Sequence, residues 1–137
     1  MTKKSNEFIL GRMYISQDEL NELHKMFHEC GPFFIALGEE IRQKIILDIL
    51  DAGVDGLNVM TLTSMSHLSR PAISHHLKVL KDSGLVIAEK KGTQIFYKVS
   101  LSDSFLNGIN LFQSTLGIIQ RVGELKKKAG MTDGESK

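Results

Sequence analysis

One stretch in the second half of the sequence is cationic, and basic side chains gathered in this way could bind a polyanion. From residue 67 to residue 98 there are six Lys or Arg residues and two acidic ones, a local net charge of +4. From residue 7 to residue 51 the balance reverses, with nine acidic and four basic residues. The 137-residue chain has a net charge of only +1. It is therefore the uneven distribution of charge that favours nucleic acid as a partner.

The first part of the cationic stretch is a predicted helix over residues 69–82. Ser69 is a favoured N-cap residue, and Pro71 fits the first turn of a helix. The apolar residues recur at steps of four and three, the spacing of a buried stripe: Ile73, Leu77 and Leu80. His76 lies near this stripe, so we expect it to be structural, packing against the domain or bonding a backbone carbonyl.

The opposite face of this helix is polar and basic, and an α-helix with such a face fits the major groove of DNA. Ser69 and the helix N-terminus could hold a phosphate. The same face carries Pro71 and the residues that could read base edges: Arg70, Ser74 and His75. We expect Lys78 and Lys81 to contact phosphates.

The second part of the cationic stretch is a predicted hairpin of two strands, residues 85–90 and 94–100. In the second strand every other residue is apolar, the period of a half-buried strand: Ile95, Tyr97 and Val99. Residues 91–93, Lys-Gly-Thr, form a short glycine-containing loop typical of a hairpin. Basic and polar side chains surround its tip: Lys90, Lys91, Thr93 and Gln94.

Further helices are expected before this region. Ser16 and Glu19 fit a capping box, which opens a helix that should end near Cys30. Its apolar residues stand at helical spacing: Leu20, Leu23 and Phe27. After the apolar run 33–37, helix signals resume at residue 39, and a wide inward face is expected from Ile41, Ile45, Ile46, Ile49 and Leu50. Asn58 can cap a short helix, whose residues facing one way are Val59, Leu62 and Met65.

The last predicted element is a helix that starts at a cap on Ser102 or Ser104 and ends near Lys128. Its apolar residues form a coiled-coil-like seam: Phe105, Ile109, Phe112, Leu116 and Ile119. A helix of about 23 residues, roughly 35 Å long, is too long for one small domain to bury. The seam therefore suggests a dimer interface, with packing inside the domain as the alternative.

Two motifs resemble those of ArsR-type repressors, a family of winged helix-turn-helix regulators. Residues 34–42, Phe-Ile-Ala-Leu-Gly-Glu-Glu-Ile-Arg, are similar to the family segment F-x-A-L-(G/A)-D-P-T-R, with Glu-Ile where Pro-Thr is usual. Residues 68–86 resemble L-S-x-x-x-(V/I)-S-x-H-L-K-x-L-x-x-A-G-L-V at more than ten positions without a gap. The resemblance covers about residues 33–100.

This resemblance implies a mainly α-helical winged helix-turn-helix with a small β-hairpin, dimerising through its terminal helices and binding double-stranded DNA. Helix 69–82 would read the major groove. The hairpin would be the wing, whose residues 90–94 would enter a minor groove or contact flanking phosphates; an ordinary charged hairpin is the alternative. The terminal seam would pair with the helix at 16–30. Two reading helices about 34 Å apart predict an imperfect inverted-repeat operator and a regulator, expected to be a repressor.

Metal sensing at the family's usual positions is not expected. The thiolate site would fall at residues 60–64, which hold no Cys, and no His follows His76 to supply the site on the last helix. His24 and His28, four residues apart, are alternative metal ligands together with Cys30. No cofactor is expected. Regulation by a small organic ligand, by redox at the single cysteine or by protein level alone is left open.

The main alternative function is a winged-helix protein-interaction module without direct DNA binding, whose affinity would depend little on salt. An enzyme is not expected, because the sequence has no Gly-rich phosphate loop and no nucleophile elbow. It also has no signal-peptide core, so we expect a cytoplasmic protein without a membrane partner. The expected organisation is an arm at 1–15, one domain at 16–129 with terminal dimerisation helices, and a disordered tail at 130–137.

Overall fold

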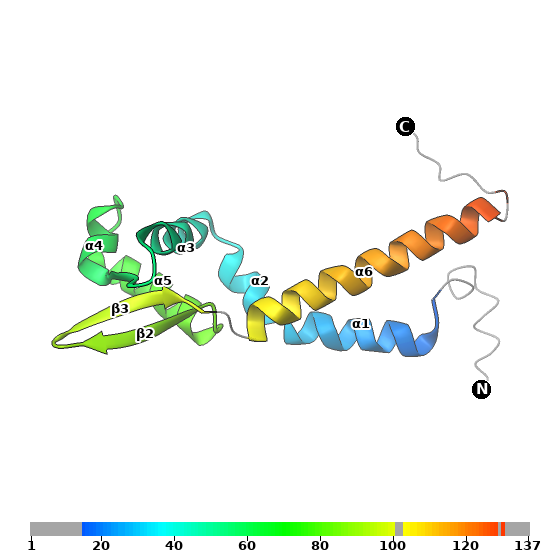
Figure 1. Ribbon diagram of the computed structural model, residues 1–137, viewed down its shortest axis with the longest axis horizontal. Helices are drawn as coiled ribbons and strands as arrows, with labels where there is room; N and C mark the ends of the chain where they lie inside the picture. Colours follow the sequence, from blue (N-terminus) through cyan, green and yellow to red (C-terminus); the bar gives the residue numbers. More distant parts are fainter. Residues whose placement is uncertain (1–14, 101–102, 129, 131–137) are drawn as a thin grey trace. The chain divides into compact units, whose positions relative to one another are not determined.

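The computed structural model describes residues 15–100, 103–128 and 130 (Figure 1). The chain divides into two compact units, a central unit of residues 30–108 and a terminal-helix unit of residues 1–29 and 109–137. Apart from Ile15 and Gly130, the predicted arm and tail lie outside the described residues, and so does Ser102.

The central unit contains four complete helices, α2 (Gly31–Leu37), α3 (Glu40–Ala52), α4 (Val59–Ser64) and α5 (Arg70–Asp82), and the start of α6 (Asp103–Lys128). Its strands are β1 (Leu57–Asn58), β2 (Val86–Lys91) and β3 (Gln94–Val99). They form one antiparallel sheet in the order β1-β3-β2. The terminal-helix unit consists of α1 (Gln17–Glu29) and the rest of α6.

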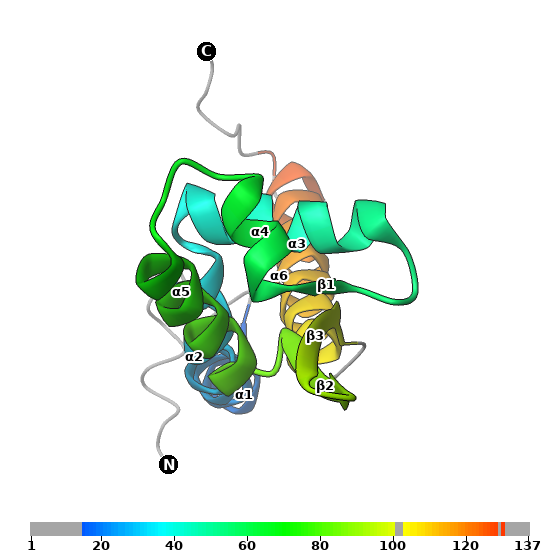
Figure 2. The ribbon, with the colours of Figure 1, turned by 90° about the vertical axis from the view of Figure 1, so that its left-hand side faces the viewer.

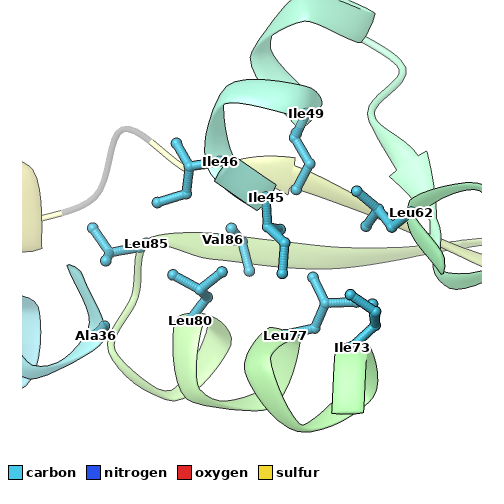
Figure 3. Close-up of a cluster of buried hydrophobic side chains, with 10 residues drawn as sticks. All are labelled: Ala36, Ile45, Ile46, Ile49, Leu62, Ile73, Leu77, Leu80, Leu85 and Val86. Atoms are coloured by element: carbon cyan, nitrogen blue, oxygen red, sulfur yellow. The ribbon is translucent and has the colours of Figure 1, made fainter. Parts of the chain in front are cut away.

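The buried core of the central unit joins α3, α4, α5 and the start of the hairpin (Figure 3). Ile73, Leu77 and Leu80 of α5 point toward Ile45 and Ile49 of α3. All five side chains are at most 2% exposed. The predicted apolar stripe of α5 is therefore confirmed, and its burial leaves the opposite face of the helix outward.

Three residues predicted to face inward are exposed: Leu50 (56%), Met65 (42%) and Ile95 (46%). Leu50 lies in the last turn of α3, about 100° around the helix axis from the buried Ile49. Met65 is the C-cap of α4 and not part of that helix. Ile95 is the second residue of β3, next to the hairpin turn, where the strand has left the core. Fewer residues of these elements face the core than the pattern of apolar residues in the sequence predicts.

Strand β1 adds a third strand to the predicted hairpin. Leu57 pairs with Tyr97 and Asn58 pairs with Phe96 of β3. Gly56 makes this approach possible, because its φ is +70° and a Cβ atom there would overlap the carbonyl oxygen of Tyr97. Only glycine combines that backbone conformation with the absence of a side chain.

Figure 2 shows α4, α5 and the β2–β3 hairpin on the side of the central unit that faces the viewer. Helix α4 packs against α5, and α5 packs against β2. A helix-turn-helix followed by a hairpin on a small sheet confirms the predicted mainly α-helical winged helix-turn-helix. Among the helices that the structure describes, none has the length and apolar character needed to cross a bilayer.

Helix α1 begins with the predicted capping box. The Oγ of Ser16 accepts a hydrogen bond from the backbone N–H of Glu19 at 3.0 Å, and the carboxylate of Glu19 accepts one from the N–H of Ser16 at 3.0 Å. Helix α6 runs for 26 residues and ends at Lys128, as predicted. Ser104 lies inside α6, and its hydroxyl donates to the carbonyl of Ser83, so it is not the helix cap.

Candidate nucleic-acid interface

Helix α5 begins at the predicted N-cap. The Oγ of Ser69 accepts a hydrogen bond from the N–H of Ala72 at 3.3 Å, and Pro71 stands in the first turn. Because Ser69 has an extended backbone, the chain turns sharply into the helix. All predicted contact residues on this segment are exposed: Ser69, Arg70, Pro71, Ser74, His75, Lys78 and Lys81. The structure thus brings them together on one outward face.

Polar contacts hold both ends of α4. At its start, Asn58 Oδ1 accepts a hydrogen bond from the N–H of Thr61 at 2.8 Å, the predicted cap. At its end, Lys44 of α3 donates to the carbonyl of Met65 at 3.0 Å. The turn into α5 is supported by a bond of 2.9 Å from the N–H of Leu68 to Ser66 Oγ. These bonds fix the turn that precedes the exposed face of α5.

The predicted wing residues lie at and beside the turn of the β2–β3 hairpin, and all four are exposed: Lys90, Lys91, Thr93 and Gln94. Lys91 already has partners inside the chain. Its Nζ lies 3.5 Å from Asp55 Oδ1 and 5.5 Å from the centroid of the Phe96 ring. Such an exposed ion pair contributes little free energy, so a phosphate could compete for the same ammonium group.

The start of α5 and the wing share one depression of about 220 Å³. Arg70 lines it from α5, and Thr93 and Gln94 line it from the hairpin turn and β3. The start of α4 and the strands supply the rest of the lining: Asn58, Val59, Met60 and Ile95. Sequence reasoning missed Asn58 as a site residue because its capping role accounted for it. Here its Nδ2 also donates to Gln94 Oε1 at 2.9 Å.

Several basic residues of the cationic stretch are paired with acidic neighbours. Lys78 Nζ lies 2.8 Å from Asp82 Oδ2 on the exposed face of α5. On the sheet, Lys98 pairs with Glu89, and this hydrogen bond lowers the pKa of the Glu89 carboxyl. Three further basic residues of the cationic stretch are exposed, and no ion pair is among the contacts described for them: Arg70, Lys81 and Lys90. The surface thus keeps a positive excess beside these local pairs.

His76 stays on the inner side of α5, as its position in the sequence suggested. Its Nδ1 accepts a hydrogen bond from Nε of Arg42 at 3.2 Å. The partner is therefore a side chain on α3, not the backbone carbonyl that was one of the two expectations. The pKa of His76 is lowered, first by burial and then by the nearby guanidinium of Arg42.

In the terminal-helix unit, α1 lies alongside α6 (Figure 1). Glu19 and Arg121 form a two-pronged ion pair, with Nη1 to Oε2 at 2.7 Å and Nη2 to Oε1 at 2.9 Å. A groove of about 420 Å³ also lies between these helices. The apolar part of its lining comes from Leu23, Met26, Gly117 and Ile118.

The predicted seam on α6 follows one exposed ridge: Ile109 (49%), Phe112 (58%), Leu116 (53%) and Ile119 (61%). Phe27 of α1 is 52% exposed, whereas Leu20 and Leu23 are half-buried. Phe105 differs from the ridge because it belongs to the central unit, where it packs edge-on against Phe33 with ring centroids 5.6 Å apart. Leu111 of α6 is fully buried, and its burial was not recognised in the sequence.

His24 and His28 are exposed on α1, whereas Cys30 is buried. Among the residues the structure describes, no three His, Cys, Asp or Glu side chains gather closely enough to hold a metal ion. A redox-sensing thiol would need solvent access, and Cys30 is only 1% exposed.

Comparison with known proteins identifies the family to which this chain belongs. The sequence model described as bacterial regulatory protein, arsR family, matches residues 43–88. The arsenical resistance operon repressor of Bacillus subtilis (strain 168) is 32% identical over 91 residues, which cover 66% of this chain and 82% of the relative. The transcriptional repressor SdpR of the same organism is 35% identical over 83 residues, 56% of this chain and 89% of the relative.

Among solved structures, an ArsR-like transcriptional regulator from Rhodococcus sp. RHA1 superposes with a TM-score of 0.65 at 26% identity. The match covers 76% of this chain and 93% of that one. The matched region of the sequence includes α4, α5 and the start of the wing. The chain therefore belongs to the ArsR family of bacterial regulatory proteins and is a DNA-binding transcriptional regulator.

Proposed function

We propose that this protein is a homodimeric repressor that binds an imperfect inverted repeat, with α5 in the major groove and wing residues 90–94 on the flanking DNA. One observation carries the proposal. The first residue of α5 and the tip of the wing line the same depression on the outside of the central unit. A duplex that receives the helix in its groove would meet both elements at once.

Within this arrangement the contacts divide by chemistry. Arg70, Ser74 and His75 stand in the N-terminal half of α5, the part that reaches base edges in related binding modes. Ser69 and the first turn offer backbone N–H groups to a phosphate. Lys78, Lys81 and Lys90 supply charge for the backbone, which strengthens binding without selecting a sequence.

Dimerisation is supported by the exposed apolar ridge of α6. Four apolar side chains about half exposed in a row are costly in water, and a patch of this kind usually marks an interface. A second copy of the same ridge is the partner we propose, because a two-fold axis makes a helix face complementary to itself. A two-fold dimer would present two α5 helices about one DNA turn apart, roughly 34 Å, which requires an inverted repeat.

Repression, as opposed to activation, is supported by the names of the two relatives described above, which are both repressors, although another relative, HlyU of Vibrio cholerae, is named as an activator. A repressor that overlaps a promoter needs no surface beyond those for DNA and for the second subunit. For a regulator that acts on DNA in a bacterial cell, we also propose a cytoplasmic location.

Selection of DNA fragments from the source genome by the purified protein tests this proposal. We expect recovered fragments to share an inverted repeat, and we expect affinity to fall steeply with salt because phosphate contacts release counterions. The double variant Lys81→Ala, Lys90→Ala should bind less tightly, whereas Lys25→Ala, which removes an exposed cation from α1, is the matched control. Recovery of random fragments, or salt-independent binding to a protein instead, would contradict the proposal.

A further inference from the structure

Arg42 is a buried cation whose partners lie in α2, in α5 and at the N-cap of α3. Its side chain, on α3, is only 7% exposed. A buried charge is strongly unfavourable unless hydrogen bonds satisfy it. Nη1 donates to the carbonyls of Ile35 at 3.0 Å and Ala36 at 3.3 Å, and Nη2 donates to Glu39 at 3.0 Å.

The two hydrogen bonds to Ile35 and Ala36 cap the C-terminal end of α2. The carbonyls of Ile35 and Ala36 belong to the last turn of α2, where a helix leaves its carbonyl groups without partners along its own axis. A cation also suits this negative end of the helix dipole. Arg42 therefore fixes α2 to α3 through contacts that depend on direction and not only on apolar burial.

The remaining bond of Arg42 leads to the proposed DNA-reading helix. Nε of Arg42 donates to Nδ1 of His76 at 3.2 Å, across 34 residues of sequence. This geometry assigns a lone pair to Nδ1, so the imidazole is neutral and carries its proton on Nε2. The bond ends on α5 next to His75, which is on the outward face.

The rest of the inner face of α5 is held by apolar contacts, which resist rotation of the helix less specifically than a hydrogen bond with defined geometry. A small rotation of α5 about its own axis would leave Ile73, Leu77 and Leu80 covered. It would nevertheless displace the outward side chains from the base edges. The bond to His76 is thus placed to set the rotation of the helix.

We propose that Arg42 and His76 are positioning residues for DNA reading, and that a proton on Nδ1 of His76 breaks the bond between them and weakens DNA binding. The inference rests on the proposed role of α5. Protonation would place an imidazolium against a guanidinium, and two cations at hydrogen-bond distance repel each other.

The charged and titratable groups that face His76 favour the neutral ring. Arg42 from α3 and His75 on α5 both lower the pKa of His76 after the larger effect of burial, and only Glu39, at the start of α3, opposes them. The ring is therefore neutral at pH 7 and takes up its proton below its ordinary pKa of 6.5. The bond should be intact at pH 7.5 and should be lost progressively in acid.

DNA binding by two variants of His76 separates positioning from packing. His76→Asn keeps an acceptor near the position of Nδ1 but cannot take up a proton, whereas His76→Leu removes the acceptor. His67→Asn, an exposed histidine in the turn before α5, is the control for titration near the DNA. Affinity for a selected genomic fragment should fall more for the wild type than for His76→Asn between pH 7.5 and 5.5, by less than about tenfold, because the pKa of His76 lies below 6.5.

His76→Leu should bind weakly at both pH values, and His67→Asn should follow the wild type. Parallel pH profiles for the wild type and His76→Asn would overturn the inference, and so would full affinity of His76→Leu at pH 7.5.

A titration of the DNA-free protein by NMR tests the coupling separately from the proposed function. Imidazole ¹⁵N shifts should show Nδ1 of His76 unprotonated at pH 7.5. Its protonation should move the backbone amide signals of residues 70–75 in the wild type but not in His76→Asn. Protonation of His76 without movement of these signals would refute the coupling. A wild-type protein that binds no genomic DNA at pH 7.5 but passes this NMR test would instead refute the proposed function.

Discussion

Arg121 of α6 holds the carboxylate of Glu19 of α1 with both of its terminal nitrogens, at 2.7 and 2.9 Å. Because Glu19 is also the residue of the capping box that reaches back to Ser16, one carboxylate both closes the first turn of α1 and attaches that turn to α6. The hydrogen bonds from Arg121, with that from Ser16, lower the pKa of Glu19 to about 2.

The attachment of α1 should therefore survive mild acid. A carboxyl whose pKa is depressed stabilises the folded state above its ordinary pKa of 4.5, and this contribution is lost as the pH falls toward 2. We expect Glu19→Gln to accelerate amide hydrogen exchange in α1 at pH 7, while Glu22→Gln, one turn or less away on the same helix, leaves it nearly unchanged. Equal exchange rates in the two variants would show that the ion pair between Glu19 and Arg121 does not stabilise α1.

Gly56 should tolerate replacement poorly. In Gly56→Ala the new methyl group would collide with the Tyr97 carbonyl, in addition to the strain of a positive φ. Gly92→Ala is a matched control, because Gly92 also has a positive φ, of +64°, but nothing lies within 4 Å of a Cβ there. Strain alone costs about 1–2 kcal/mol, so urea unfolding should show a larger loss for Gly56→Ala. Similar losses in both variants would contradict the predicted collision.

Arg70 and Lys90 should affect DNA binding in different ways. Arg70→Ala should cost about 1–3 kcal/mol at the operator and relax the choice of sequence at one position in each half-site. Lys90→Ala should weaken binding to all sequences and reduce the salt slope by about one. Fluorescence anisotropy with operator and scrambled duplexes over a range of salt concentrations measures both effects.

Lys91→Ala provides an internal comparison for the wing. Since Lys91 is already paired with Asp55 and lies near Phe96, its removal should change the salt slope less than removal of Lys90. The reverse order would show that DNA draws Lys91 away from its partners inside the chain.

The ridge on α6 should control the oligomeric state. Phe112→Glu places a charge in the centre of the proposed interface. The dissociation constant of the dimer should therefore rise at least about 30-fold, the effect of losing a strong interface contact. Val54→Glu, at a residue 87% exposed in the central unit, should leave the dimer unchanged. Sedimentation equilibrium distinguishes these outcomes, and a wild-type protein that is monomeric at high concentration would disprove the proposed dimer.

The structural features that could be predicted from the sequence depend mainly on residues close together in the chain. The caps at Ser16, Asn58 and Ser69 are each satisfied within three residues of chain, so residue type and spacing were enough to predict them. The apolar stripe of α5 was predictable for the same reason.

Features that join distant parts of the sequence were not predictable in this way. Strand β1 has only two residues and exists because β3 accepts it. The Arg42–His76 bond spans 34 residues, and neither residue type alone indicates the other as its partner. The narrow inward face of α3 likewise depends on which elements cover it, which explains why Leu50 was misplaced.

Asn58 connects the wing to the start of α4. One atom of its amide caps α4 and the other donates to Gln94. If the wing moved away from α4, the cap could stay in place while the donor on Nδ2 became available to another acceptor. A phosphate oxygen could replace Gln94 there, so the hairpin could adapt to the width of the groove without loosening the helix-turn-helix.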